Sequence, residues 1–452
     1  MSSLRRARAA AAAADDELSL SLPNPLWQRI WGALPPHERA RCACVCRAWR
    51  AAVLDQSLWL RLDLTRAGGV PRALATEALL RGAAALARGH LQLLAAPGSP
   101  NLRHAVLDVA AASAGSLREL YHGVAPCGSV EEALRPADVE ALLRAAPALA
   151  CHVAMVCRDI DDVRRCGPLL RGEPPFAGLR IHDLEVDCQL VEEWVLRLAA
   201  DVAACQHGTL AGLRLHRAHL NSIAAADALV DALLAQRCSA LALTHCYTTP
   251  ASASRLARLL RGGALTYLTI SHDNEALLDA PAAALLAGAL RECPALRSLE
   301  LCRVRVLRDA QVAAALLPAL TAHPGLRRLV LNDDIYGSCD DATAARLGAL
   351  VAANSPLEHL VVDLGLNHRG EEWLRPLLEA LPRNTRLREL LCGFHHVSEA
   401  FAHDALLPAV RANAGLRCLS PIWRGTGIHF APSLVEAMAL VDRRARDADA
   451  AP

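Results

Sequence analysis

Three short segments of the sequence place metal-binding or acid–base residue types close together. Cys42, Cys44 and Cys46 alternate along five residues, and thiols at such spacing raise the possibility of a zinc site. Zinc needs about four converging ligands, whereas the middle residue of this set points away from the other two on a helix. No second ligand pair is near in the sequence. We therefore expect no metal at this position.

The histidines and aspartates fail comparable geometric requirements. His395 and His396 are adjacent, and adjacent residues of a strand or loop point apart, so they do not chelate together. The acidic pairs at 333–334 and 340–341 lack the alternation and the closing Glu of a calcium loop. We interpret all of these as loop side chains, with partner contact as the alternative for the aspartates.

Motifs of enzymatic catalysis are missing from the sequence. There is no Gly-rich phosphate loop, and neither G-x-S-x-G nor H-E-x-x-H occurs. No nucleophile–base pair has the support of a motif. The sequence therefore predicts a non-catalytic chain that uses no cofactor and no metal.

Composition narrows the class of protein further. The 452 residues allow about three domains or one long repeat array. With 48 basic and 47 acidic residues, the net charge is +1, which disfavours a nucleic-acid binder. Every basic residue is Arg, because the sequence contains no Lys. Sixteen scattered Cys without a secretory signal indicate reduced thiols, and no apolar run reaches the ~18 residues of a membrane span. We expect the cytoplasm, the nucleus or both, away from membranes.

The first sixty residues predict three short helices. One begins at Asn24 and Pro25, a second runs through Glu38 to about Val45, and a third covers about residues 47–54. Four of the seven Trp, at positions 27, 31, 49 and 59, lie in or just after these helices. So small a unit cannot bury them all, which predicts a partner surface.

This segment resembles the F-box motif over about 43 residues. Trp31 stands where the family usually has Phe, and Arg39 stands where an apolar residue is common, which weakens one helix face. The resemblance implies docking on a Skp-family adaptor and, through it, on a cullin. It rests on Leu22-Pro23-x-x-Leu26-x-x-x-Ile30-Trp31-x-x-Leu34, on Val45-Cys46-Arg47-x-Trp49-Arg50 and on Leu58-Trp59-x-x-Leu62-Asp63-Leu64. The contact positions that it implies are Leu22, Pro23, Leu26, Ile30, Leu34, Val45, Cys46, Trp49 and Trp59.

A short unit, Leu-x-x-Leu-x-Leu, recurs along the rest of the chain. Copies begin at 210, 238, 265, 296, 326, 357, 387 and 416, and weaker ones at 181, 150, 117 and 88, giving about twelve units. Each unit combines a short strand with one buried face and a stretch of helical spacing. Neither element can bury its own apolar face, so stacked units must share a core. We predict a curved array with parallel strands on the concave side and helices outside.

The array resembles leucine-rich repeats of the ribonuclease-inhibitor subtype over residues 85–425. Asn354, Asn384 and Asn413 stand three residues before the first Leu of a unit, as that subtype often has. The fold implied is an α/β solenoid that follows an F-box. The predicted organisation is a disordered leader (1–20), the F-box (21–65), the repeats (85–425), a C-terminal cap helix (426–446) and a frayed tail (447–452).

Residues that flank the buried strand positions point to the concave face, and those just past the strands form its rim. Their mixed charge and occasional aromatics suit protein recognition, with an ordinary solvated face as the alternative for each residue. The candidates are Arg214, His216, Tyr267, His272, Glu300, Arg303, Arg328, Asn332, Asp333, Tyr336, His359, Asp363 and Trp423.

Together these resemblances imply a substrate receptor of a Skp–cullin–F-box ubiquitin ligase. The F-box would bind the adaptor, and the repeats would bind an unknown protein substrate and raise its local concentration near the transferred ubiquitin. The alternative is a non-ligase scaffold or inhibitor of the ribonuclease-inhibitor or GTPase-activator kind, in which the N-terminal helices only cap the array.

Overall fold

The computed structural model describes most of the chain. The described residues are 24–42, 44, 50, 53–65, 70, 74–97, 102–123, 133–205, 210–246, 252–272, 278–333, 339–364, 371–393, 397–421 and 431–450. The predicted leader at 1–20, Cys46 and the pair His395–His396 lie outside these residues.

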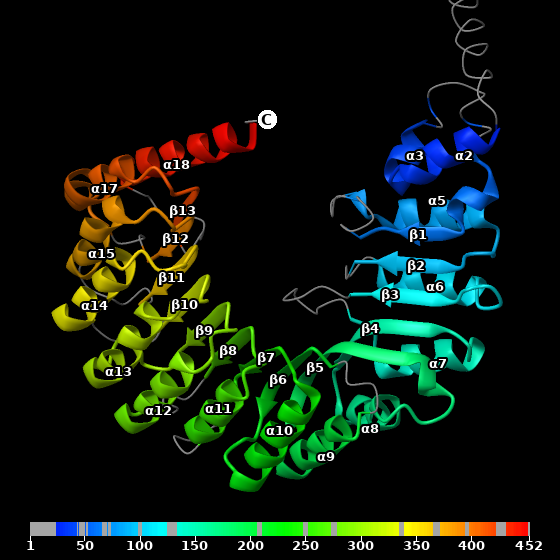
Figure 1. Cartoon of the computed structure of the whole chain (residues 1–452), viewed down its shortest axis with the longest axis horizontal. Helices are drawn as coiled ribbons and strands as arrows, with labels where there is room; N and C mark the ends of the chain where they lie inside the picture. Colours follow the sequence, from blue (N-terminus) through cyan, green and yellow to red (C-terminus); the bar gives the residue numbers. More distant parts are fainter. Residues whose placement is uncertain are drawn as a thin grey trace, which may run out of the picture. The chain divides into compact units, whose positions relative to one another are not determined.

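Thirteen parallel strands follow one another in the sheet in chain order (Figure 1). The predicted pattern of one strand per repeat is confirmed from residue 210 onward, where each strand begins two residues after the first position of a unit. The strands are β1 (Arg61–Asp63), β2 (Leu93–Ala96), β3 (Glu119–His122), β4 (Ala150–Cys157), β5 (Leu179–Leu190), β6 (Gly212–Ala218), β7 (Ala240–Thr244), β8 (Tyr267–Ser271), β9 (Ser298–Cys302), β10 (Arg328–Asn332), β11 (His359–Asp363), β12 (Glu389–Cys392) and β13 (Cys418–Pro421).

Helices alternate with the strands. Many begin at a side-chain cap, such as Asp159, Ser222 and Asp279, whose oxygen accepts a hydrogen bond from a first-turn N–H. The α-helices are α2 (Asn24–Ala33), α3 (Pro36–Cys42), α5 (Glu77–Ala87), α6 (Arg103–Ala112), α7 (Pro136–Ala145), α8 (Ile160–Leu170), α9 (Glu192–Ala203), α10 (Ile223–Gln236), α11 (Ser252–Arg261), α12 (Ala280–Arg291), α13 (Ala310–Thr321), α14 (Asp341–Ala352), α15 (Arg375–Ala380), α16 (Glu399–Phe401), α17 (Leu407–Ala412) and α18 (Pro432–Ala450). Single turns are η1 (Gln56–Trp59), η3 (Phe176–Gly178), η4 (Glu372–Leu374), η5 (Leu381–Arg383) and η7 (Ala402–Leu406).

The chain divides into two compact units. The first comprises residues 1–186 and 204–210, and the second comprises 187–203 and 211–452. In the first unit the sheet starts at β1, ahead of the predicted start of the repeats at residue 85. Leu62, Leu94, Leu120 and Cys151 pair across β1 to β4 as one buried column of side chains.

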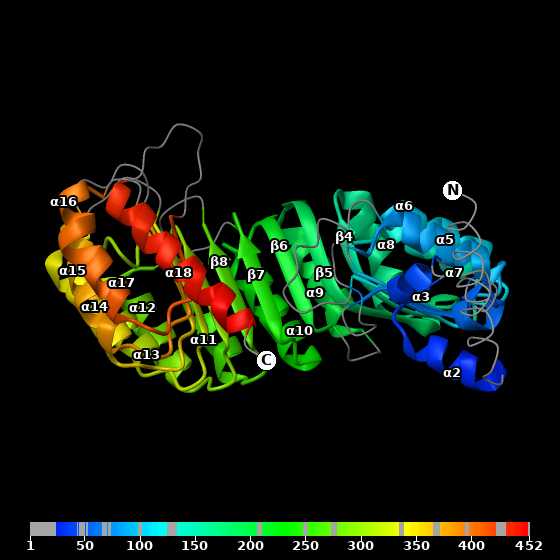
Figure 2. The same ribbon diagram turned by 90° about the horizontal axis from the view of Figure 1, so that it is seen from above.

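In the second unit the strands β6 to β13 pair in register, and Figure 2 shows β6, β7 and β8 lying side by side. Leucines from 241 to 419 form a buried column across seven of these strands. Helix α18 packs on α17 and β13. It continues to Ala450, through residues that we expected to fray.

Buried polar side chains join neighbouring repeats of the second unit. Asn413 donates from Nδ2 to Leu381 O (2.7 Å), and its Oδ1 accepts from Leu416 N (2.9 Å). His323 occupies the equivalent position three residues before Leu326. Its Nδ1 accepts from Leu326 N (3.0 Å), and its Nε2 lies 3.0 Å from Cys293 O. A histidine thus takes the place of the repeat asparagine.

We expect His323→Ala to lower the free energy of unfolding by about 2–4 kcal/mol, because it leaves buried backbone groups without partners. His323→Asn should lose no more than about 1 kcal/mol, since asparagine supplies equivalent hydrogen bonds at position 413.

Burial lowers the pKa of His323. The contribution of His323 to stability is therefore present above about pH 6.5 and is lost as the pH falls through the lowered pKa. Urea unfolding at several pH values measures both effects. Equal losses in the two variants would contradict this role.

Candidate functional site

The N-terminal helices lie at the β1 end of the first unit (Figure 1). Trp31 and Trp59 are only 2 % and 1 % exposed, and Trp59 Nε1 donates to Val53 O (2.7 Å). The prediction that Trp59 contacts an adaptor, and that these indoles remain for a partner to cover, is therefore wrong for both residues. The physical reason is that the N-terminal segment is not isolated, because α5 packs on η1 and β1 joins the sheet.

Arg39 holds this segment together. Its Nε donates to Leu34 O (2.8 Å), its Nη1 donates to Leu58 O, and its guanidinium carbon lies 5.5 Å from the centroid of the Trp59 ring. Burial lowers the pKa of Arg39. We expected this residue to weaken a helix face. Instead, its planar cation satisfies carbonyls from two separate turns and packs on an indole.

Of the predicted adaptor positions other than Trp59, the structure describes the side chains of two. Ile30 is 42 % exposed on α2, and Leu34 is half-buried. Leu26 lies in α2, but its side chain is outside the described residues. Also outside them are Leu22, Pro23, Val45, Cys46 and Trp49.

Replacing Arg39 by Ala should lower the free energy of unfolding of the first unit by about 2–4 kcal/mol, because two hydrogen bonds to backbone carbonyl oxygens and a cation–π contact are lost. Arg41→Ala is the matched control, since Arg41 is largely exposed and pairs with the partly exposed Glu38 (3.2 Å). That control should change stability by less than about 1 kcal/mol. Hydrogen exchange in η1 and β1 measures the difference, and equal protection in the two variants would count against the role of Arg39.

The second candidate surface is the strand face that the helices leave uncovered, which we call the open face. Of the predicted substrate positions, Arg328 is exposed. Tyr336 and Trp423 lie outside the described residues. Partly exposed positions are Arg214, His216, Tyr267, Glu300, Arg303, Asn332 and His359.

Three predicted contact residues are buried instead. His272, Asp333 and Asp363 are all at most 3 % exposed. The Asp333 carboxylate accepts from Arg305 N (2.9 Å) and Leu307 N (2.7 Å) of the preceding repeat, and burial raises its pKa. It therefore orders the loop after β9 and is not a rim contact.

Side chains of the open face pair with each other across strands. Glu300 accepts from Thr269 Oγ1 (3.1 Å) and lies 3.2 Å from Arg328 Nε. His359 Nδ1 lies 2.8 Å from Glu389 Oε2. The arrangement places opposite charges side by side on β9 and β10 and a histidine beside a carboxylate on β11 and β12, which suits selective contact with another protein.

A row of rings on the open face of the first unit was missing from the predicted site. Tyr121 of β3, His152 of β4 and His182 of β5 lie next to one another. Tyr121 and His152 alternate with buried residues in their strands, which is the signal in the sequence, but the irregular early repeats obscured it.

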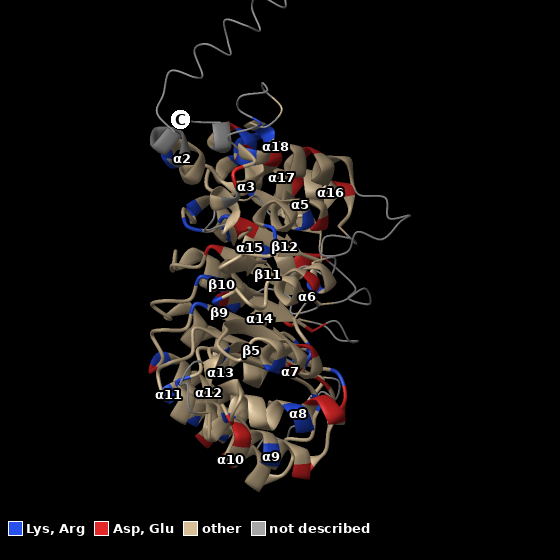
Figure 3. Cartoon of the chain, turned by 90° about the vertical axis from the view of Figure 1, so that its right-hand side faces the viewer, with Lys and Arg blue, Asp and Glu red and all other residues tan. Residues whose placement is uncertain are grey.

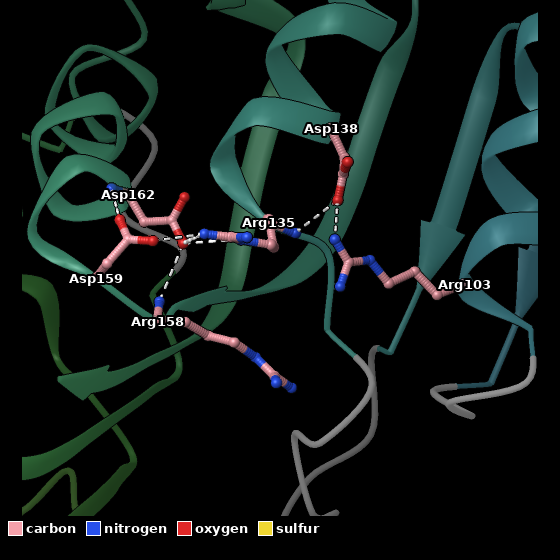
Figure 4. Close-up of polar contacts among 6 residues, drawn as sticks. All are labelled: Arg103, Arg135, Asp138, Arg158, Asp159 and Asp162. Carbon is pink, nitrogen blue, oxygen red and sulfur yellow. Dashed lines mark hydrogen bonds and ion pairs between the residues drawn. The ribbon is translucent and has the colours of Figure 1, made fainter.

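Figure 4 shows a chain of ion pairs in the first unit. Arg135 Nη2 lies 2.7 Å from both Asp159 Oδ2 and Asp162 Oδ2, and Arg103 pairs with Asp138. Arg103, Asp138 and Asp162 belong to the first turns of α6, α7 and α8. The charges are therefore matched within the fold and link three successive repeats.

Basic and acidic residues are interspersed over the helices (Figure 3). Within the described ranges, no group of three or more His, Cys, Asp and Glu side chains is arranged to hold a metal ion. Among the same residues, no helix combines the length and apolarity required to cross a membrane.

Residues 19–65 match a family model described as F-box-like, which confirms the resemblance inferred from the N-terminal motif. The chain thus carries an F-box-like domain, with β1 as its last element, followed by a parallel-strand solenoid. No curated protein matches the chain.

Proposed function

We propose that this protein is the substrate-recognition subunit of a Skp–cullin–F-box ubiquitin ligase. The F-box-like match at residues 19–65 is the observation that carries the proposal. The F-box-like domain binds the Skp-family adaptor, and the open face of a leucine-rich-repeat array binds a protein substrate. The chain performs no bond chemistry, because its contribution is to hold the substrate near the transferred ubiquitin.

The described part of the F-box-like domain supports this assignment. Ile30, one of the positions implied by the resemblance, leaves 42 % of its surface exposed on a helix whose neighbour Trp31 is buried. Ile30 is therefore accessible at a position where the F-box resemblance implies contact with the adaptor.

The connection between the domain and the repeats also favours a receptor. Leu64 N donates to Ala95 O (2.7 Å), and Gln92 N donates to Leu60 O (2.7 Å), so β1 is bonded directly into the sheet. A partner on the first repeats would therefore be held in a fixed position relative to the F-box-like domain, as efficient transfer to a bound substrate requires.

Binding of a purified Skp-family adaptor to the full chain tests the function. Ile30→Asp should reduce the affinity at least tenfold, because it places a charge at an apolar contact. Leu285→Asp is the matched control, since Leu285 is 45 % exposed on α12 of the other unit. This variant should bind the adaptor with unchanged affinity. The triple variant Leu22→Ala, Pro23→Ala, Trp49→Ala should also lose binding. Failure of the unmodified chain to bind would favour a scaffold.

The lysine-free composition gives a second test. Since all 48 basic residues are Arg, no residue of this chain offers an ε-amine for ubiquitin. In a reconstituted ligase, we expect Lys-containing subunits to be modified while this receptor is not. Arg144→Lys should create an acceptor without loss of charge, because Arg144 is largely exposed beside Glu140. Mass spectrometry of the modified products measures the outcome, and heavy modification of the unaltered chain at other groups would contradict it.

A further inference from the structure

A β-bulge brings two imidazole rings together on the open face of the first unit. Across β4 and β5, Arg180 pairs with His152 and Asp183 pairs with Ala154, with a register shift between Val153 and Ala154. The shift makes room for His182 beside His152. Bulges of this kind re-aim a side chain on a sheet.

The two rings meet through nitrogens that face each other. His152 Nδ1 and His182 Nε2 are 3.4 Å apart, whereas the ring centroids are 5.6 Å apart and the planes differ by 19°. On its other side, His152 stacks on Tyr121 with centroids 4.5 Å apart and planes 15° apart. Because the facing nitrogens point towards each other, they form a donor–acceptor pair and do not direct two lone pairs to one metal.

The number of bound protons determines whether this pair can persist. In neutral histidine one ring nitrogen carries hydrogen and the other accepts, so one ring can donate to the other. A first added proton can occupy the outer nitrogen of the donating ring and leave the bond intact. A second proton must occupy the accepting nitrogen, which removes the bond and places two cations side by side.

Charged groups of β3 and β5 act on the pair. Burial lowers the pKa of His152, as do the charges of His182 and Arg180, while Glu119 of β3 opposes them. Burial also lowers the pKa of His182, with Arg180 acting in the same direction and Asp183 opposing. The folded chain therefore binds protons at this pair less readily than the unfolded chain does, and its stabilising effect falls as the pH decreases below about 6.5.

We propose that His152 and His182 form a proton-sensitive contact between β4 and β5, intact with no more than one added proton and broken by two. Acidification then separates the rings and adds positive charge to the open face between Tyr121 and Arg180. This device belongs to the fold itself and is independent of the proposed function.

A double-mutant cycle at two pH values tests it on the full chain. The variants are His152→Gln, His182→Gln and the pair together, with the urea midpoint of unfolding measured at pH 8 and pH 5. Because the cycle cancels the titration of other groups, it isolates the contact. At pH 8 the loss of stability in the double variant should be smaller than the sum of the losses in the two single variants. At pH 5 this coupling should vanish or reverse its sign.

One further measurement makes the result specific. A second cycle starts from the His182→Phe variant, which keeps a ring at position 182 but removes its nitrogens. In that cycle the coupling between positions 152 and 182 should be the same at both pH values. The proposal is overturned if the His152–His182 coupling is absent at pH 8, if it is equal at both pH values, or if His182→Phe preserves the pH-dependent change.

Discussion

The structure depends on the inability of any single repeat to bury its own apolar face. A strand of four or five residues and one helix expose apolar side chains on facing sides, and only an adjacent copy can cover what remains. The in-register columns, such as Leu62–Leu94–Leu120 in the first unit, meet this constraint, because each leucine is covered by those of the strands on either side. Stability in such arrays is approximately a sum over neighbours.

Buried polar groups likewise find their hydrogen-bond partners in an adjacent repeat. A buried backbone carbonyl at the end of one helix needs a donor, and Asn413, Asn384 and His323 supply contacts from the following repeat. Asp333 performs the converse task, because its carboxylate accepts N–H groups from the loop of the preceding repeat. These side chains therefore belong to the interface between repeats, although their types alone suggest a binding surface.

The F-box-like domain is joined to the array by this same arrangement of neighbours. Its last strand, β1, pairs with β2, and α5 packs on η1, which contains the buried Trp59. Arg39 then connects the end of α2 to η1 through carbonyl oxygens and an indole face. Ile30 remains exposed on α2, while the solenoid has mixed charge along its open face.

The sequence by itself determined where the strands from residue 210 onward lie, because alternation over five residues and a period near thirty are local properties that chain order preserves. It also determined the F-box-like segment, whose spacing of apolar residues is continuous. Only the tertiary structure decided which polar residues face solvent, since the burial of His272, Asp333 and Asp363 is imposed by neighbouring repeats about thirty residues away. The role of Arg39 and the meeting of His152 with His182 were decided in the same way, because each requires atoms that lie far apart along the chain.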